Sequence, residues 1–254
     1  MKVRVLGSGT STGVPRIGND WGRCDPADPR NRRRRAAILM ENEGERLLVD
    51  CGPDLREQLL DADVGTLDRV IVTHDHADHC HGIDDLRAVR WNNGALLPIH
   101  ARADVLDRLA ARFGYVFEDR GLYKALFTAH PVDGDMRWGG GTLRFVDQPH
   151  GGITSLGMRF DHDGKSFAYA IDFEEVTDEM RALYCGVDVW LCDCVRREPH
   201  PTHAHLDMVL DAARTLGVGR LVLTHLDNSM DHAQLSGELP GWAQPAYDGM
   251  EIDL

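Results

Sequence analysis

An apolar run that ends in a cluster of histidines and carboxylates is the strongest constraint on how this chain folds. Val70-Ile71-Val72 is β-branched throughout and is closed by Thr73, which indicates a short buried strand. Directly after it the chain reads His74-Asp75-His76-Ala77-Asp78-His79. Imidazoles and carboxylates at this spacing, where a strand passes into a turn, can bind two metal ions side by side.

The composition is that of an ordinary globular protein. Of 254 residues, 43% are hydrophobic and 27% are charged, enough for one large α/β domain or two small ones. A net charge of −13 predicts a surface that as a whole repels nucleic acid. No apolar run is long enough to span a bilayer and the N-terminus lacks a signal-peptide pattern, so we expect a cytoplasmic protein. The six cysteines include no Cys-x-x-Cys pair, which argues against a disulfide framework or a zinc knuckle.

Strand-like and helix-like patterns alternate along the chain, as in α/β proteins. Asp163-Gly164 is a favoured two-residue hairpin turn, and Gly217 is placed to cap a helix. After Asp231 we expect irregular packing. Strands are predicted over 2–6, 36–41, 46–50, 97–100, 142–147, 155–162, 165–171 and 187–192, and helices over 53–62, 83–91, 103–113, 176–183 and 206–216.

A second strand repeats the first motif. The run 220–225, which ends in Thr224-His225, is a near copy of 69–74, which ends in Thr73-His74. This repeat suggests two similar halves that share one site. His150 and Asp172 also follow predicted strands. Asp50 closes a further apolar strand and is a candidate partner for a metal-bound imidazole.

Candidate metal ligands therefore come from the ends of several strands. We expect one ion on His74, His76 and His150, a second on Asp78, His79 and His225, and Asp172 as the bridge. Oxygen and imidazole ligands without thiolate suit zinc, manganese or iron. Two ions about 3.5–4 Å apart can hold a hydroxide and brace a displacement, so the predicted chemistry is hydrolysis.

Two further stretches have open interpretations. The loop 7–13 is rich in Gly, Ser and Thr. Its amides either face a phosphate or line the floor of a site, or the loop is an ordinary tight turn. The basic run Arg30 to Arg35 is either a solvated segment or a set of guanidinium groups that face an anionic substrate.

The pattern His74-x-His76-x-Asp78-His79, with His150, Asp172 and His225, resembles the metallo-β-lactamase superfamily. This resemblance implies an α/β fold, an αβ/βα sandwich of two mixed sheets covered by helices, with a dinuclear site of zinc or manganese at one edge. The opening 6–15 and His203, which lies 22 residues before His225, are similar to the PhnP-like phosphodiesterases. Cys24 is the single cysteine of the early loop, a departure from the Cys-rich zinc site found in that group.

The resemblance also implies a reaction. His203 corresponds to a general acid that protonates the leaving hydroxyl, with His205 as the alternative, and Asp78 and His203 are the expected catalytic residues. We therefore expect residues 1–254 to form a single hydrolase domain built from two similar halves. Its expected activity is dinuclear-metal-dependent hydrolysis of a small cyclic or nucleotide-like phosphodiester, such as ribose 1,2-cyclic phosphate.

Two alternatives use the same fold: a tRNA 3′-processing endoribonuclease, and a thioester or lactone hydrolase. The expected partner is a small phosphorylated substrate, with no membrane and no nucleic acid beyond a nucleotide-like substrate. A homodimer is left open.

Overall fold

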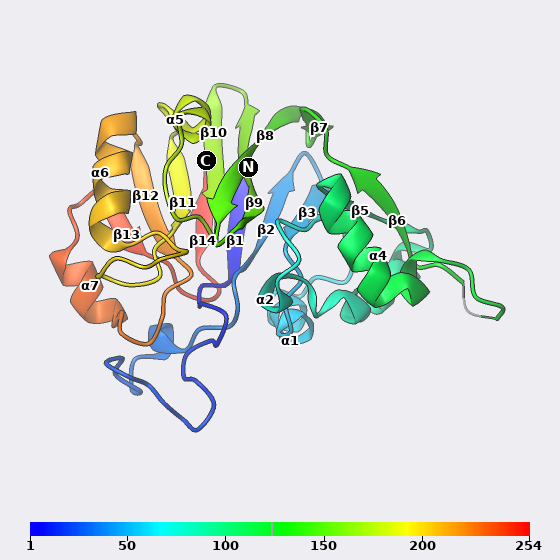
Figure 1. Cartoon of the computed structure of the whole chain (residues 1–254), viewed down its shortest axis with the longest axis horizontal. Helices are drawn as coiled ribbons and strands as arrows, with labels where there is room; N and C mark the ends of the chain where they lie inside the picture. Colours follow the sequence, from blue (N-terminus) through cyan, green and yellow to red (C-terminus); the bar gives the residue numbers. More distant parts are fainter. Residues whose placement is uncertain (123) are drawn as a thin grey trace.

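Two seven-stranded sheets pack face to face in the computed structural model, which describes residues 1–122 and 124–254 (Figure 1). The first sheet has the order β14 (Glu251–Asp253), β1 (Lys2–Gly7), β2 (Ala37–Asn42), β3 (Glu45–Val49), β4 (Arg69–Ile71), β5 (Leu97–Ala101) and β6 (Phe127–Pro131). The second has the order β13 (Ala243–Pro245), β12 (Arg220–Thr224), β11 (Val189–Asp193), β10 (Lys165–Ala170), β9 (Ile153–His162), β8 (Gly141–His150) and β7 (Met136–Trp138).

Alternating side chains explain why the sheets form a sandwich. Along β2, Ile38 and Met40 point into the core between the sheets, whereas Leu39 points to the outer face. In β10, Phe167 and Tyr169 likewise face the inner core while Ala168 faces outward. Both faces of each sheet are therefore apolar, and the outer faces need a cover of helices.

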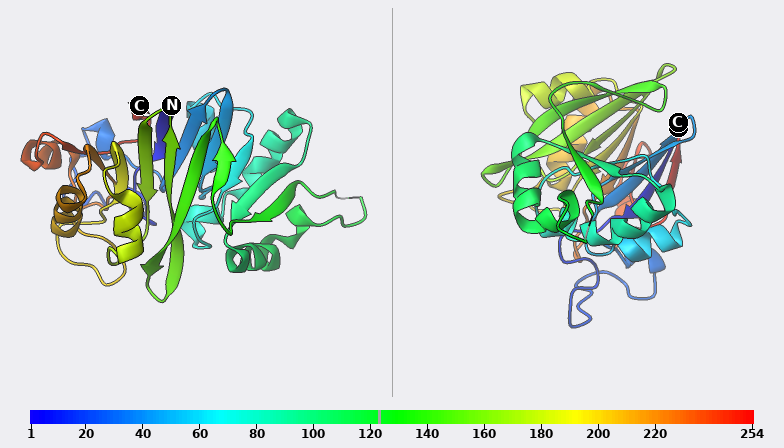
Figure 2. Two further views of the ribbon diagram at one scale, coloured as in Figure 1. Left: turned by 90° about the horizontal axis from the view of Figure 1, so that it is seen from above. Right: turned by 90° about the vertical axis from the view of Figure 1, so that its right-hand side faces the viewer.

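The helices provide that cover on both sides (Figure 2). Leu55 of one helix and Leu109 of another pack on the outer face of the first sheet, and Val209 packs on that of the second. The first group comprises α1 (Leu55–Asp61), α2 (Ala77–Cys80), α3 (Leu86–Asn93) and α4 (Ala103–Phe117), and the second comprises α5 (Asp178–Tyr184), α6 (Leu206–Leu216) and α7 (His232–Glu238). The predicted αβ/βα sandwich is confirmed. In the described part of the chain, no helix has the length and apolar character needed to cross a bilayer.

Most predicted helices and strands are present, and residues with turn-forming backbone explain where several of them begin or end. Gly217 ends α6 with a φ of 68°, and Asp163 and Gly164 form the hairpin turn with φ of 46° and 73°. The predicted helix 83–91 begins as a 3₁₀ turn over Ile83–Asp85 before α3.

Two expectations were wrong, and two strands were missed. The segment after Asp231 is regular: it forms α7, β13 and β14, and β14 pairs with β1 so that Ile252 lies opposite Val3. The strands β6 and β7 were not predicted, because both are short edge strands with few buried residues. His150 is the last residue of β8 and does not follow a strand that ends at 147.

The parallel strands bring the predicted ligands to one edge. In the first sheet β3, β4 and β5 run parallel, and in the second β10, β11 and β12 do. Their carboxyl ends are where ligands bind in open α/β sheets. Asp50, Asp172 and His225 stand at these ends, are fully buried, and have φ of 66°, 52° and 59°. Non-glycine residues held in this region are a feature of functional sites.

Candidate metal centre

The turn after β4 supplies the first part of the site. His74 follows the strand, His76 is the residue before α2, and Asp78 and His79 lie in its single turn. His74 and His79 are fully buried, with ring centroids 4.3 Å apart. His79 Nε2 is 3.2 Å from an oxygen of Asp78. These side chains therefore converge within one short segment.

The second sheet completes the cluster around Asp172. The Nε2 atoms of His74, His79 and His150 each lie 3.4 Å from Asp172 Oδ2. His225 Nε2 lies 3.3 Å from Asp172 Oδ1 and 3.6 Å from Asp78 Oδ2. Asp172 thus reaches ring nitrogens from both halves of the chain, those of His74 and His79 as well as those of His150 and His225.

Three groups of possible ligands result, and all contain Asp172; within each, one atom per residue lies within 4.8 Å of the others. The first is His74, His76, His150 and Asp172, the second is Asp78, His79, Asp172 and His225, and the third joins Asp193 and His203 to Asp172 and His225. His76 faces the first group through Nδ1, which is 3.3 Å from His150 Nε2. All seven sequence-predicted ligands are brought together, in the same two sets that the sequence analysis expects.

A second layer of contacts orients the imidazoles. His79 Nδ1 donates to Asp50 Oδ2 at 2.7 Å, and His150 Nδ1 donates to the carbonyl oxygen of Thr202 at 2.7 Å. Donation from Nδ1 leaves Nε2 as the lone-pair atom that faces the cluster. Asp50 also accepts from the amide and hydroxyl of Thr73, at 2.8 and 3.0 Å.

Two arginines of α4 hold the turn from the side away from the cluster. Asp75, between the two histidines, is 5% exposed and accepts a hydrogen bond from Arg108 Nε at 2.8 Å. Arg112 donates to the carboxylate of Asp75 through Nη2 and to its carbonyl oxygen through Nη1. Both arginines belong to α4, so this helix fixes the backbone that carries His74 and His76.

The electrostatics show that the site is built for positive charge. Burial, reinforced by the neighbouring His79, lowers the pKa of His74 to about 4. Burial alone would lower the pKa of His225, but Asp172, Asp193 and Asp78 raise it to about 10. The pKa of Asp172 lies well below its ordinary value because His225 and His79 overcome the effect of burial. The carboxylates thus favour cations at the adjacent nitrogens.

The donor set fits divalent ions. The Nε2 atoms of His74, His79 and His225 and Oδ1 of Asp172 are buried and have no hydrogen-bond partner among the residues that the structure describes. Buried polar atoms are normally paired, so four such atoms aimed at one another call for a cation between them. Imidazole and carboxylate without thiolate match zinc or manganese.

His203 lies beside the cluster in the orientation of a proton donor. Its Nδ1 donates to Asp193 Oδ2 at 3.1 Å and lies 3.7 Å from Asp172 Oδ1. Asp193 is fully buried, and its other oxygen is 3.5 Å from His225 Nδ1. The expected alternative, His205, is the residue before α6 and is not among the residues that line the cavity over the cluster.

Sequence reasoning missed Asp193 as a site residue, although the signal was present, since it closes the apolar run of β11 as Asp50 closes that of β3. It also missed part of the cavity wall. The cavity has a volume of about 290 Å³, and besides the cluster and His203 it is lined by Ser11, Gly151 and Thr202. The Gly- and Ser-rich loop thus lines the cavity through Ser11, one of the roles considered for it from the sequence.

The arginines of the basic run Arg30 to Arg35 do not share a single role. Arg33 is 2% exposed and donates to the carbonyl oxygens of Asp227 and Met230 at 3.0 and 2.6 Å. Arg30 pairs with Asp28 at 2.9 Å. Neither simple expectation, a solvated segment or a set of substrate ligands, describes the run as a whole.

Comparisons with known proteins agree with this geometry. Residues 45–226 match the family model of the beta-lactamase superfamily domain. A crystal structure of a diphosphatase from the PhnP family is 33% identical, with a TM-score of 0.90 over 99% of this chain and 96% of that one. Human tRNase Z, short form, shares the fold at a TM-score of 0.73 and 17% identity, over 100% of this chain and 99% of that one.

Relatives with other names also match. The octanoyltransferase of Porphyromonas gingivalis is 33% identical over 99% of this chain, which spans about half (51%) of that relative's length. Ribonuclease Z of Mycobacterium bovis is 26% identical over 89% of this chain and 85% of its own length. The family match covers most of the chain and includes the cluster from His74 to His225. The chain therefore belongs to the metallo-β-lactamase superfamily, in its PhnP-like branch, and is a metal-dependent hydrolase.

Proposed function

We propose that this protein hydrolyses a small phosphodiester, cyclic or nucleotide-like, with two divalent ions and a histidine general acid. The ions, zinc or manganese, would be held by His74, His76 and His150 on one side and by Asp78, His79 and His225 on the other, with Asp172 between them. When bound, they supply an activated water and positive charge for the phosphoryl oxygens.

The observation that carries the proposal is the placement of His203. Its Nδ1 is held by the buried Asp193, and the residue lines the cavity over the cluster, so Nε2 is the nitrogen that remains to give a proton. A sugar alkoxide is a poor leaving group, and protonation by a positioned imidazolium removes that difficulty. Ester and lactone hydrolysis has less need of such a donor. The hydrogen bond from Nδ1 to Asp193 holds the ring in the same orientation throughout.

The residues around the reacting bond have separate tasks. Water attacks phosphorus, a new P–O bond forms and the bond to the leaving oxygen breaks. His203 gives its Nε2 proton to that oxygen. Asp78 would act as a metal ligand, and its carboxylate would accept the proton that the attacking water loses. The diphosphatase of the PhnP family supports a small phosphorylated substrate.

A tRNA 3′-processing activity is the second candidate, since ribonuclease Z proteins and human tRNase Z share the fold. The net charge of −13 weighs against it, because an RNA backbone would need a strong local basic surface. A thioester hydrolase is weaker still. The cavity lining of Ser, Thr, Gly, His and Asp offers no apolar wall for an acyl chain.

A substrate panel tests the proposal on the metal-loaded protein. The panel holds a 2′,3′-cyclic nucleotide, ribose 1,2-cyclic phosphate, bis-p-nitrophenyl phosphate, precursor tRNA, a thioester and a lactone. We expect turnover of the small diesters with kcat/KM well above that for the thioester and lactone. Cleavage of precursor tRNA alone would assign the second candidate instead.

A further inference from the structure

The loop between β11 and α6 carries the general acid and is closed at its base. The amide of Val195 donates to the carbonyl oxygen of Ala204 at 3.1 Å, and the amide of Leu206 donates to the carbonyl oxygen of Arg196 at 3.0 Å. Residues 197–203 lie between these bonds and belong to neither a helix nor a strand. Side-chain contacts therefore determine the conformation of this segment.

One peptide bond of this loop touches two parts of the site. The carbonyl oxygen of Thr202 accepts a hydrogen bond from His150 Nδ1 at 2.7 Å, and His150 is a candidate metal ligand. The same peptide bond joins Thr202 to His203, whose Nδ1 donates to Asp193 at 3.1 Å. Because a peptide unit is planar and moves as one piece, its rotation shifts the acceptor of His150 and the backbone of His203 together. The conformation of Thr202 thus sets the orientation of both histidines.

His200 fixes the residue that carries this carbonyl group. The amide of Thr202 donates to His200 Nδ1 at 3.3 Å, and the hydroxyl oxygen of Thr202 lies 3.3 Å from the same nitrogen. An amide can only donate, so Nδ1 must carry the lone pair and Nε2 the proton. A side chain that accepts from the amide two residues later forms a turn that Asn and Asp usually make. Here an imidazole takes that role, with its ring centroid 4.9 Å from that of His203.

We propose that His200 is a positioning residue for the hydrolysis. By fixing Thr202, it sets the orientation of the two side chains that depend on this residue, the general acid His203 and the candidate ligand His150. This inference rests on the proposed function and adds a residue to it. His200 is not among the described residues that line the cavity over the cluster, so it acts through Thr202 and not by contact with substrate.

A different side chain holds the first part of the loop. Arg196 donates to the carbonyl oxygens of Glu198 and Pro199, at 3.2 and 2.6 Å. These bonds and those at the base of the loop do not involve His200, which is partly exposed. Its replacement should therefore release only the segment around Thr202 and leave the fold intact.

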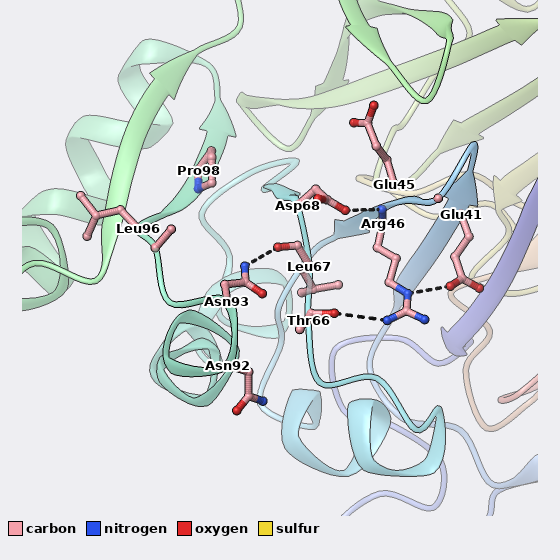
Figure 3. A pocket seen from close by; sticks show the side chains of 12 residues that line it. Glu41, Glu45, Arg46, Thr66, Leu67, Asp68, Asn92, Asn93, Leu96 and Pro98 are labelled. Atoms are coloured by element: carbon pink, nitrogen blue, oxygen red, sulfur yellow. Dashed lines mark hydrogen bonds and ion pairs between the residues drawn. The ribbon is translucent and has the colours of Figure 1, made fainter.

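A matched control is available at the opposite edge of the first sheet. A cavity of about 680 Å³ lies there, where β3, β4 and β5 begin (Figure 3). Asn93 lines this cavity and donates from Nδ2 to the carbonyl oxygen of Leu67 at 2.6 Å. Like His200, Asn93 is partly exposed, and its hydrogen bond joins a side chain to the backbone. Asn93→Ala therefore loses a bond of the same kind outside the site.

Three variants test the positioning role in the metal-loaded protein. His200→Ala removes the acceptor, and His200→Gln moves it one methylene farther from the backbone. His200→Asn keeps an acceptor atom on Cγ, at the place of Nδ1. With a 2′,3′-cyclic nucleotide, we expect the first two variants to lower kcat by up to about 100-fold with little change in KM, as for a misplaced reacting group. His200→Asn and Asn93→Ala should retain most of the native kcat.

The leaving group separates positioning from a general loss of structure. Bis-p-nitrophenyl phosphate needs no proton donor, because p-nitrophenolate leaves without protonation. His200→Ala should therefore lower kcat for this diester much less than for the cyclic nucleotide. Partial unfolding would reduce both rates equally.

Two further readouts do not depend on activity. Zinc affinity, measured by competition with a chromophoric chelator, should fall about tenfold in His200→Ala, because the partner of His150 is no longer fixed. It should be unchanged in Asn93→Ala. Nitrogen-15 NMR of the zinc-loaded protein should show His200 with a proton on Nε2 and none on Nδ1, at a resonance that His200→Asn removes.

Equal losses of kcat in His200→Asn and His200→Ala would overturn this role, as would equal effects of His200→Ala on the two diesters. Equal zinc affinities of His200→Ala and Asn93→Ala, or a proton on Nδ1 of His200, would also overturn it. If the native protein hydrolyses neither diester, the proposed function fails. The zinc affinities and the NMR spectrum then decide on their own whether His200 positions His150.

Discussion

The two sheets end in the same Thr-His pair, yet they contribute to the site in different ways. After β4, one turn from His74 to His79 gives four candidate ligands, and Asp50 and Asp75 fix that turn locally. The second sheet gives one candidate from each of β8, β10 and β12. The first half thus presents a preformed cluster, whereas the second half depends on sheet register to deliver single residues.

This difference predicts where substitutions act. Substitutions of the residues that hold the turn, such as Asp50 and Asp75, should disturb only the candidate ligands His74 to His79. Asp172, which contacts ring nitrogens from both halves, should affect the entire site.

The largest effect is expected for Asp172→Asn. Loss of the shared carboxylate removes a ligand from both proposed metal sites, so the variant should bind fewer metal ions than the native protein and its diester turnover should fall to the level of metal-free protein. Metal analysis by plasma mass spectrometry with parallel kinetics checks this. Glu175→Gln, an exposed neighbour, is the control. An Asp172→Asn protein with full metal content would show that the halves bind metal independently.

The next largest effect is expected for His203→Ala. Loss of the general acid should lower kcat about 10²- to 10⁴-fold for sugar leaving groups, with unchanged metal content. The loss should be much smaller for bis-p-nitrophenyl phosphate, because p-nitrophenolate leaves without protonation. His205→Ala, two residues away, should retain activity. Normal hydrolysis of a cyclic nucleotide by His203→Ala would remove His203 from the mechanism.

A smaller effect is expected for the contacts that Arg108 and Arg112 make with Asp75. Asp75→Asn weakens the hold of Arg108 and Arg112 on the backbone between His74 and His76, and should lower metal affinity about 10- to 100-fold. Competition with a chromophoric chelator measures this. Asp104→Asn is the matched control, since Asp104 pairs with the same Arg108 but is exposed. Equal affinities of the two variants would show that the turn needs no external support.

The smallest effect concerns a histidine in the first half that has no part in the site. Burial, with His130 and Arg69 nearby, lowers the pKa of His100 to about 4. As the pH falls, this histidine takes up a proton near pH 6.5 in the unfolded chain but only near pH 4 in the folded protein. Protonation therefore favours the unfolded state, and the free energy of unfolding should decrease between pH 6.5 and 4 by roughly 1–3 kcal/mol. His100→Gln should flatten that part of a urea-unfolding series. An unchanged slope would assign the decline to other groups.

Much of this site could be predicted because its residues close apolar strands. His74, His225 and Asp172 each follow such a strand, and parallel strands place their ends together. Asp193 carries the same signal, but nothing in the sequence shows that it lies beside His203. The partners of the basic run were equally hidden, because Asp248 and Asp54 are distant in sequence from the arginines that they contact.

The C-terminal segment was missed for a different reason. Glu251-Ile252-Asp253 carries one apolar residue, too little pattern to predict a strand. It becomes β14 because β1 offers an unpaired edge, which is a tertiary effect. Residues 1–254 as one domain of two similar halves remains our proposal. The core shared by both sheets, which contains Val5 and Leu191, supports it.

The most direct test is a crystal structure of the manganese- or zinc-loaded protein with anomalous data at the metal edge. The account predicts two peaks within about 4 Å of each other, one among His74, His76 and His150 and the other among Asp78, His79 and His225, with Asp172 in contact with both. A single peak, or peaks that leave the residues of the second sheet outside coordination distance, would contradict it.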